Sequence, residues 1–304
     1  MRQTWRKIGW IFNADQSSDW LHSHASVPLA EHLSEDLYRI YFSSRDSKNQ
    51  SHTGFIVIDI KDPTKVLETS ALPILSPGDL GCFDDSGAMA SWITTHKQGR
   101  YLYYAGWNLG ITVPFRNAIG LATAPDGQGF KKMFAGPIVD RTPTEPHFVG
   151  TCCVLNHNDA WKMWYLSCTE WRIKNDRPQH RYHIKYATSA DGIAWDRKGV
   201  VSIPFDNDEE YAISRPCVLY EESLYRMWYS YRGDRYRIGY AESTDGMNWT
   251  RYDEQCGVDI EPEGWDSAMV EYPYVFRHKE DLYMLYNGNG YGKTGFGIAI
   301  LENG

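Results

Sequence analysis

The chain has 304 residues and a formal net charge of −8, with 31 Lys or Arg against 39 Asp or Glu. A nucleic-acid-binding protein is expected to present a basic face, and no run of Lys or Arg here is longer than a pair, which excludes that class of partner. No apolar run approaches the roughly 20 residues needed to span a bilayer. Because the apolar piece at residues 8–12 is too short for a secretory signal and lacks a cleavage site, we expect a cytoplasmic protein.

The six cysteines include no Cys-x-x-Cys pair, so the sequence indicates neither a zinc site nor a disulfide framework. Cys152 and Cys153 are neighbours on a predicted strand, where their side chains point to opposite faces. We expect buried free thiols. We also expect no metal or other cofactor to be required, although clustered acids and histidines remain able to hold a calcium-like ion.

The first predicted element is an apolar strand over residues 5–12, which has no partner close to it in the sequence. After it, an aromatic strand core recurs about every 60 residues. The five cores span residues 38–42, 101–104, 161–165, 225–229 and 283–286. A repeat of this length that contains several strands is typical of the blades of a β-propeller.

The fourth repeat shows the pattern of one blade. Short strands are predicted over residues 215–220, 224–230 and 236–241, and an outer strand follows residues 243–249. We therefore predict an all-β fold, a five-bladed propeller of four-stranded antiparallel blades in one domain, residues 1–304. The blades are placed at about residues 20–78, 79–140, 141–204, 205–262 and 263–304 plus 1–15. The last repeat lacks its outer strand, so we expect residues 5–12 to supply it and to close the ring.

An Asp-Gly-x-x-Trp motif ends the third and fourth repeats, at Asp191–Trp195 and Asp245–Trp249, with a degenerate copy in residues 124–130. A reaction centre needs a single copy, whereas every blade needs a turn. We therefore expect the Asp to accept turn hydrogen bonds, the Gly to take a positive φ, and the Trp to pack between blades.

Acidic residues gather just before, and at, the predicted start of each blade's innermost strand. This set comprises Asp19, Asp84, Asp85, Glu145, Glu209, Glu210, Asp266 and Glu271, with His22, His24, His147 and Arg215 beside them. Converging acids repel each other, which leaves one protonated while another stays ionised. Glycoside cleavage needs that combination, a carboxylic acid for the leaving oxygen and a carboxylate as base or nucleophile. The alternative is that these acids only satisfy loop amides or pair with Arg215.

The blade endings Tyr186–Trp195 and Tyr240–Trp249, with the strand form Tyr-x-Met-Trp-Tyr, resemble the five-bladed propellers of glycoside hydrolase families 43, 32 and 130. The resemblance covers nearly the whole chain and implies two or three catalytic carboxylates at the narrow end of a funnel. Glu271-Tyr-Pro273 matches the Glu-x-Pro acid motif of family 32, and Glu145-Pro146 loosely matches an Asp-Pro. The first-blade Asp of these families is absent, so Asp85 of the next blade is taken in its place.

We predict an enzyme acting on a glycan or sugar conjugate, with Asp85 as general base or nucleophile, Glu271 as general acid and Glu145 as an orienting charge. The predicted substrate-binding residues are His24, Glu210, Arg215, Asp266, Trp92, Trp107 and Trp171. One alternative is a cytoplasmic transferase or phosphorylase of polysaccharide assembly, which an added basic group such as Arg215 would favour. The other is a non-catalytic sugar-binding propeller, which predicts acids that lie too far apart or face away.

Overall fold

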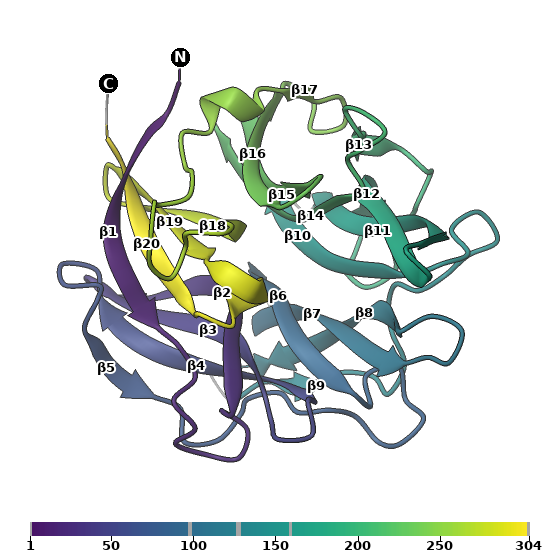
Figure 1. Ribbon diagram of the computed structural model, residues 1–304, viewed down its shortest axis with the longest axis horizontal. Coiled ribbons are helices and arrows are strands. Elements are labelled where there is room, and N and C mark those ends of the chain that lie inside the picture. Colours follow the sequence, from purple (N-terminus) through teal and green to yellow (C-terminus); the bar gives the residue numbers. More distant parts are fainter. Residues whose placement is uncertain (1, 97–98, 126–128, 158–159, 303–304) are drawn as a thin grey trace.

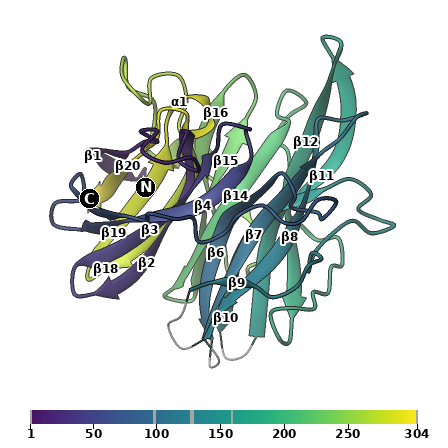
Figure 2. The same cartoon turned by 90° about the horizontal axis from the view of Figure 1, so that it is seen from below.

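The computed structural model describes residues 2–96, 99–125, 129–157 and 160–302, and it is an all-β structure (Figures 1 and 2). Its named helical elements are short: the 3₁₀ turn η2 (Asp253–Gln255) and α1 (Asn289–Gly292). No helix in it is long and apolar enough to cross a membrane. All six cysteines are free, and all except Cys82 are buried, as the sequence predicted.

The strands follow one another as five antiparallel groups of four. Group one comprises β2 (Ser23–Ser34), β3 (Leu37–Arg45), β4 (Ser51–Asp59) and β5 (Val66–Thr69). Group two comprises β6 (Gly87–His96), β7 (Gly99–Leu109), β8 (Phe115–Ala124) and β9 (Lys131–Lys132). Group three comprises β10 (Val149–His157), β11 (Ala160–Lys174), β12 (Arg177–Ser189) and β13 (Val201–Ile203). Group four comprises β14 (Ala212–Glu221), β15 (Leu224–Arg232), β16 (Tyr236–Ser243) and β17 (Thr250–Arg251).

Group five joins the two ends of the chain. It contains β18 (Glu271–His278), β19 (Asp281–Asn287), β20 (Phe296–Glu302) and β1 (Thr4–Phe12). β1 lies antiparallel to β20 at the edge of this sheet, and Figure 1 shows these two strands side by side. The expected pairing of residues 5–12 with the last repeat is therefore confirmed.

Hydrogen bonds join these groups into three sheets, because groups one and two are bridged by Ser51 and Gly87, and groups three and four by Tyr182 and Ala212. In the described part of the chain no sheet closes on itself, so the predicted closure is not a hydrogen-bonded ring. The first strands of the groups nevertheless contact one another: β2 contacts β6 and β18, β6 contacts β10, and β14 contacts β10 and β18. The starts of these strands are thereby brought together around the centre of Figure 1.

The Asp-Gly-x-x-Trp motifs form turns that join neighbouring groups. The Asp245 carboxylate accepts hydrogen bonds from the backbone N–H groups of Met247 (2.7 Å) and Asn248 (2.8 Å), and Gly246 has φ +78°. The Gly246 carbonyl accepts a hydrogen bond from the Trp164 indole of group three (2.7 Å). Asp191 and Gly192 repeat this turn, which confirms the structural interpretation. In the third copy, residues 126–128 lie outside the described part of the chain.

Candidate functional site

Several first strands begin with a β-bulge. Pairing with the second strand slips between Ser23 and Ser26 in β2, Val149 and Cys152 in β10, Ser214 and Cys217 in β14, and Glu271 and Tyr274 in β18. Three residues within these bulges have left-handed backbone conformations: His24 (φ +66°), Arg215 (φ +53°) and Tyr272 (φ +55°). A bulge of this kind re-aims side chains next to a functional site, at a cost of about 1–3 kcal/mol per strained residue.

Glu145, which precedes β10, is a buried carboxylate with a complete set of partners. It accepts hydrogen bonds from Tyr165 (3.0 and 3.1 Å) and Ser167 (2.8 Å), and it forms ion pairs with Lys185 (3.0 Å) and Arg197 (3.1 Å). Burial raises the pKa of this carboxyl, but the hydrogen bonds from Lys185 and Ser167 and the charges of Lys185 and Arg197 outweigh burial and lower it. Glu145 is thus held ionised and occupied, an arrangement that supports the fold.

The same arrangement recurs in two other groups. In each, a buried acid precedes the first strand, a tyrosine 20 residues later donates to it, and a lysine of the outermost strand pairs with it. The members are Asp84, Tyr104 and Lys132 in group two, with contacts of 3.0 and 2.6 Å, and Asp266, Tyr286 and Lys7 in group five, with contacts of 3.1 and 2.7 Å. We name these sets, with that of Glu145, the acid–tyrosine–cation clusters.

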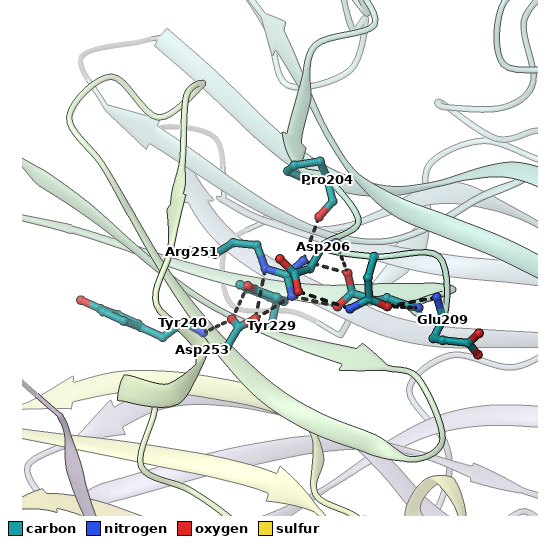
Figure 3. Close-up of polar contacts among 9 residues, drawn as sticks. Pro204, Asp206, Glu209, Tyr229, Tyr240, Arg251 and Asp253 are labelled. Carbon is teal, nitrogen blue, oxygen red and sulfur yellow. Dashed lines mark hydrogen bonds and ion pairs between the residues drawn. The ribbon is translucent and has the colours of Figure 1, made fainter.

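Group four has a variant of this cluster (Figure 3). Arg251 of β17 binds both oxygens of Glu210 at 2.8 Å and also pairs with Asp253 at 2.6 Å. Tyr229, equivalent to Tyr165 of group three, donates to Asp253, while the Glu210 carboxylate accepts the backbone N–H of Asp206 (2.7 Å). Figure 3 shows the Glu209 carboxylate pointing away from this network. A cavity of about 640 Å³ lies beside it, lined by Glu210, Tyr231, Arg235, Arg251 and Asp253 among others.

Group one replaces the cluster by aromatic packing. Trp20 stacks on Phe42 with ring centroids 5.9 Å apart, and both side chains are buried. Phe42 occupies the strand position of Tyr104 and Tyr165 but carries no hydroxyl, so no acid is needed beside it. Recurrence of the acids therefore has a structural cause, and the geometry gives Glu145, Glu210 and Asp266 internal partners in place of a substrate.

Glu271, the first residue of β18, differs from all of these acids. Its side chain is completely buried (0% exposed), and neither carboxyl oxygen makes a well-formed hydrogen bond to a described residue, although the Tyr291 amide and the Tyr272 side chain lie near enough to act on its pKa. Burial raises the pKa of this carboxyl well above its usual 4.5, although the charge of Arg232 and the nearby amide of Tyr291 oppose the rise. Burial of this kind favours the protonated form of a carboxyl, which is the form that a proton donor needs.

Tyrosines surround Glu271. The hydroxyls of Tyr182 and Tyr236 lie 2.6 Å apart, and the pKa of each is raised first by burial, with Glu271 adding to the rise. Tyr272 is next to Glu271 in the chain, and burial and the Glu271 charge raise its pKa too. We call Glu271 and Tyr182, Tyr236, Tyr272 and Tyr291 the Glu271 cluster.

Arg232, the last residue of β15, borders this cluster and was missed by the sequence analysis, which assigned it to a turn. Its guanidinium donates to the Tyr291 hydroxyl and lies 5.3 Å from the ring centroids of both Tyr211 and Tyr236. The sequence does contain a signal for Arg232. This residue follows the aromatic-rich stretch Trp228–Tyr231 at the end of β15, the strand that pairs with the bulged β14.

Asp85 lies in the turn before β6 and is half-exposed. Its carboxylate accepts hydrogen bonds from the backbone N–H of Gly81 (3.0 Å) and the hydroxyl of Ser86 (3.0 Å), and among described residues it forms no ion pair. No hydrogen bond, ion pair or electrostatic contact joins Asp85 to Glu271 within the described part of the chain.

Arg215 lies at the centre of the molecule and not in an open site. Its side chain is 1% exposed and donates to the backbone carbonyls of Ser91 in β6 and Pro28 in β2 (3.0 Å to Pro28). It therefore ties three first strands together. His24 is partly buried beside Ser23 (3.0 Å), and burial, with the charges of Arg45 and Lys293, lowers its pKa to about 4.

The three tryptophans predicted as sugar platforms have different surroundings. Trp92 is buried against Tyr274, with ring centroids 5.2 Å apart, as part of the core. Trp107 is partly exposed and donates to Ser51 at 3.1 Å. Trp171 lies on the hairpin of β11 and β12, which extends beyond its neighbours in Figure 2, and its ring is 5.6 Å from that of Phe148 and 5.5 Å from that of His180.

The aromatic residues around Trp171 adjoin the Glu271 cluster, because His180 stacks on Tyr182 with ring centroids 4.7 Å apart. Among the described residues there is no group of three or more His, Cys, Asp or Glu side chains arranged to hold a metal ion. A second cavity, of about 380 Å³, is lined by Asp84, Cys82 and Lys132 among others.

No protein-family model matches the chain. Two proteins of Mycobacterium tuberculosis, the uncharacterized proteins Rv1502 (strain H37Rv) and MT1551 (strain CDC 1551), are each 41% identical to it over 299 residues, which cover 98% of this chain and 99% of theirs.

Solved structures with a similar fold are glycoside hydrolases. A glycosyl hydrolase from Bacteroides ovatus matches with a TM-score of 0.75 at 14% identity, over 99% of this chain and 94% of its own. A thermostable family-43 glycoside hydrolase has a TM-score of 0.65 at 18% identity, over 92% and 88%. The Bombyx mori GH32 β-fructofuranosidase BmSUC1 has a TM-score of 0.60 at 16% identity, over 92% and 61%. The chain thus shares the fold of the propeller glycosidases of families 43 and 32, which confirms that resemblance.

Proposed function

This chain belongs to one protein family with Rv1502 and MT1551 of Mycobacterium tuberculosis, and we propose that it is a carbohydrate-active enzyme in which Glu271 is the general acid. The observation that carries the proposal is a completely buried carboxyl without a hydrogen-bond partner among the described residues. The fold shared with glycoside hydrolases supports a carbohydrate as substrate. We take the five strand groups as the blades of one propeller domain, residues 1–304, completed by β1.

The proposed step is a proton transfer coupled to cleavage of a glycosidic bond. The protonated Glu271 carboxyl gives its proton to the leaving oxygen while the bond from that oxygen to the anomeric carbon breaks. A nucleophile attacks the anomeric carbon, and Asp85 is the half-exposed carboxylate that we assign to activate it. Water as nucleophile gives hydrolysis, and phosphate or a sugar hydroxyl gives phosphorolysis or transfer.

Access to Glu271 requires movement of the segment that carries Tyr291. The Tyr291 amide lies beside the buried carboxyl, and its segment has left-handed backbone conformations at Gly290 (φ +70°), Tyr291 (φ +61°), Gly292 (φ +85°) and Gly295 (φ +87°). We assign residues 288–295 as a cover that shifts when substrate binds.

The test is turnover of a panel of aryl glycosides and glycosyl phosphates, each with and without added phosphate, by the wild type and the Glu271→Gln variant. Glutamine keeps the size of the side chain but supplies no acidic proton. Since general acid catalysis contributes about 10²–10⁴-fold, we expect kcat to fall by at least about 100-fold. The matched control is Glu68→Gln on the exposed face of β5, which leaves kcat unchanged.

Substantial turnover by Glu271→Gln contradicts the proposal, as does a wild type that turns over no member of a broad panel while binding sugars. The latter result identifies a non-catalytic sugar-binding propeller. Turnover only with added phosphate identifies a phosphorylase. This second candidate is favoured by Arg232 beside Glu271, a cation that forms no ion pair with any described carboxylate. Fractionation of the source cells tests the cytoplasmic location expected from the sequence.

A further inference from the structure

Cations without ion pairs surround the Glu271 cluster, although the whole chain carries a net charge of −8. Among the described residues, five cations here pair with no carboxylate: Arg45, Arg172, Lys174, Arg232 and Lys293. The acids nearest to Arg232 and Arg172 along the chain are already engaged, since Asp234 pairs with Arg235 at 3.0 Å and Glu170 with Arg181 at 3.7 Å.

Contacts connect these cations to one another around the cluster. Arg232 lies 5.3 Å from the Tyr211 ring centroid, and Lys174, on the extended hairpin, lies 6.0 Å from the same ring centroid. On the other side, Arg45 is close enough to Tyr272 for each to perturb the pKa of the other. Of these cations, Arg232 of β15 acts on Glu271 itself, whereas Arg45 of β3 acts on the neighbouring Tyr272 of β18.

Arg232 is the cation best placed to hold a ligand. Its Nε atom is buried and has no hydrogen-bond partner among the described residues. A partly desolvated guanidinium without an anion is costly, and its planar donors match phosphate and carboxylate oxygens. Burial favours the neutral form of Glu271, and this form, unlike an ionised carboxylate, adds no repulsion to such an anion.

We infer that the Glu271 site binds a carbohydrate that carries an anionic group, a phosphate ester or a carboxylate, and that Arg232 binds this group. The inference rests on the proposed function, because it names the substrate class of the same site. The partly exposed rings of Trp171 and His180, which adjoin Tyr182 and pack on the buried Phe148, provide the apolar surface on which the sugar ring stacks.

The experiment is calorimetric titration of the full chain with hexose and pentose 1-phosphates, the corresponding uronates, the neutral parent sugars and inorganic phosphate. We expect at least one anionic sugar to bind tenfold or more tightly than its neutral parent, with affinity falling as salt rises. The ligand that gains affinity, phosphate ester or uronate, identifies the source of the charge.

Variants test whether Arg232 causes the preference. Arg232→Gln should reduce the affinity for the anionic sugar to that of the neutral sugar, and Arg232→Lys should retain part of it. The control is Arg226→Gln on the same strand, whose partner Glu221 lies 3.6 Å away; it should change nothing. Thermal unfolding of each variant checks that it is folded. If Arg232→Gln is not folded, Arg232→Lys decides the question: full affinity for the anionic sugar in that variant overturns the role of the Arg232 guanidinium.

The inference is overturned if anionic and neutral sugars bind equally, if inorganic phosphate binds as tightly as the sugar phosphates, or if Arg232→Gln keeps the preference. The inference and the proposed function can fail independently of each other. Turnover of neutral glycosides that depends on Glu271 but not on Arg232 removes only the inference. Tight, Arg232-dependent binding without any turnover removes only the proposed enzyme.

Discussion

Glu145 and Glu271 are both buried acids near the start of a first strand, yet their surroundings are opposite. Two hydroxyls and two cations contact the Glu145 carboxylate, and together they lower its pKa. No described residue makes a well-formed hydrogen bond to Glu271, and burial raises its pKa. Burial alone therefore does not identify a functional acid; the partners decide whether a buried carboxyl stabilises the fold or remains available for chemistry.

The position of each acid within its strand group leads to the same conclusion. The acid of the acid–tyrosine–cation clusters occurs in groups two, three and five, always 20 residues before its tyrosine. Glu271 pairs with Asn287 of the second strand, and at the equivalent register stand Met89 in group two and Ser214 in group four. The acid that recurs in several groups stabilises the fold. Glu271, an acid at a register position that carries none in groups two and four, is the candidate for catalysis.

The largest expected difference is in stability. Glu145→Leu leaves Lys185 and Arg197 buried without their anion, so we expect the free energy of unfolding to fall by about 3–5 kcal/mol. Glu271→Leu removes a carboxyl that has no partner, so we expect no loss or a gain. Urea denaturation of both variants measures the difference, and similar losses would break the comparison.

A second difference lies in the pH dependence of stability. The unfolded Glu271 carboxyl releases its proton above about pH 4.5, whereas the folded one retains it, so the wild type loses stability relative to Glu271→Gln as pH rises above 4.5. The loss is about 1.4 kcal/mol for each unit by which the folded pKa exceeds that value. For Glu145, with its lowered pKa, the advantage of the wild type over Glu145→Gln is instead lost as pH falls below about 4.5.

Thermal unfolding of the three proteins between about pH 4 and pH 8 measures both slopes. Opposite signs are expected. Parallel curves for the two variants would show that the two acids have the same ionisation in the folded protein.

The smallest expected difference is between two tyrosines. Tyr165→Phe removes the hydroxyl that donates to the ionised Glu145, and we expect a loss of about 1.5–3 kcal/mol. Tyr182→Phe removes a hydroxyl that contacts only the neutral hydroxyl of Tyr236, for which about 0.5–1.5 kcal/mol is expected. Calorimetric unfolding compares them, and an equal or larger loss for Tyr182→Phe would contradict a charged Glu145.

The sequence predicted the strands, the Asp-Gly turns and the partner of β1 because these depend on local pattern and on the repeat. It did not predict the partners of the acids, since Lys7 and Asp266 are far apart in the chain and meet only through β1. The 20-residue spacing from acid to tyrosine is present in the sequence, but the prediction of the site did not use it. Arg215 and Trp92 were expected to bind substrate, and tertiary packing buries both.

The pairing of β1 with β20 also has a consequence for biosynthesis. β1 is synthesised before the other strands of group five, so it stays without its partner until β20 has been made. Gln3 and Trp5 contact Trp228, and Lys7 contacts Asp266, so these interactions with groups four and five also form late. The order of synthesis therefore delays completion of group five until β20 has been made, and until then β1 is a strand without its native partner that can pair wrongly.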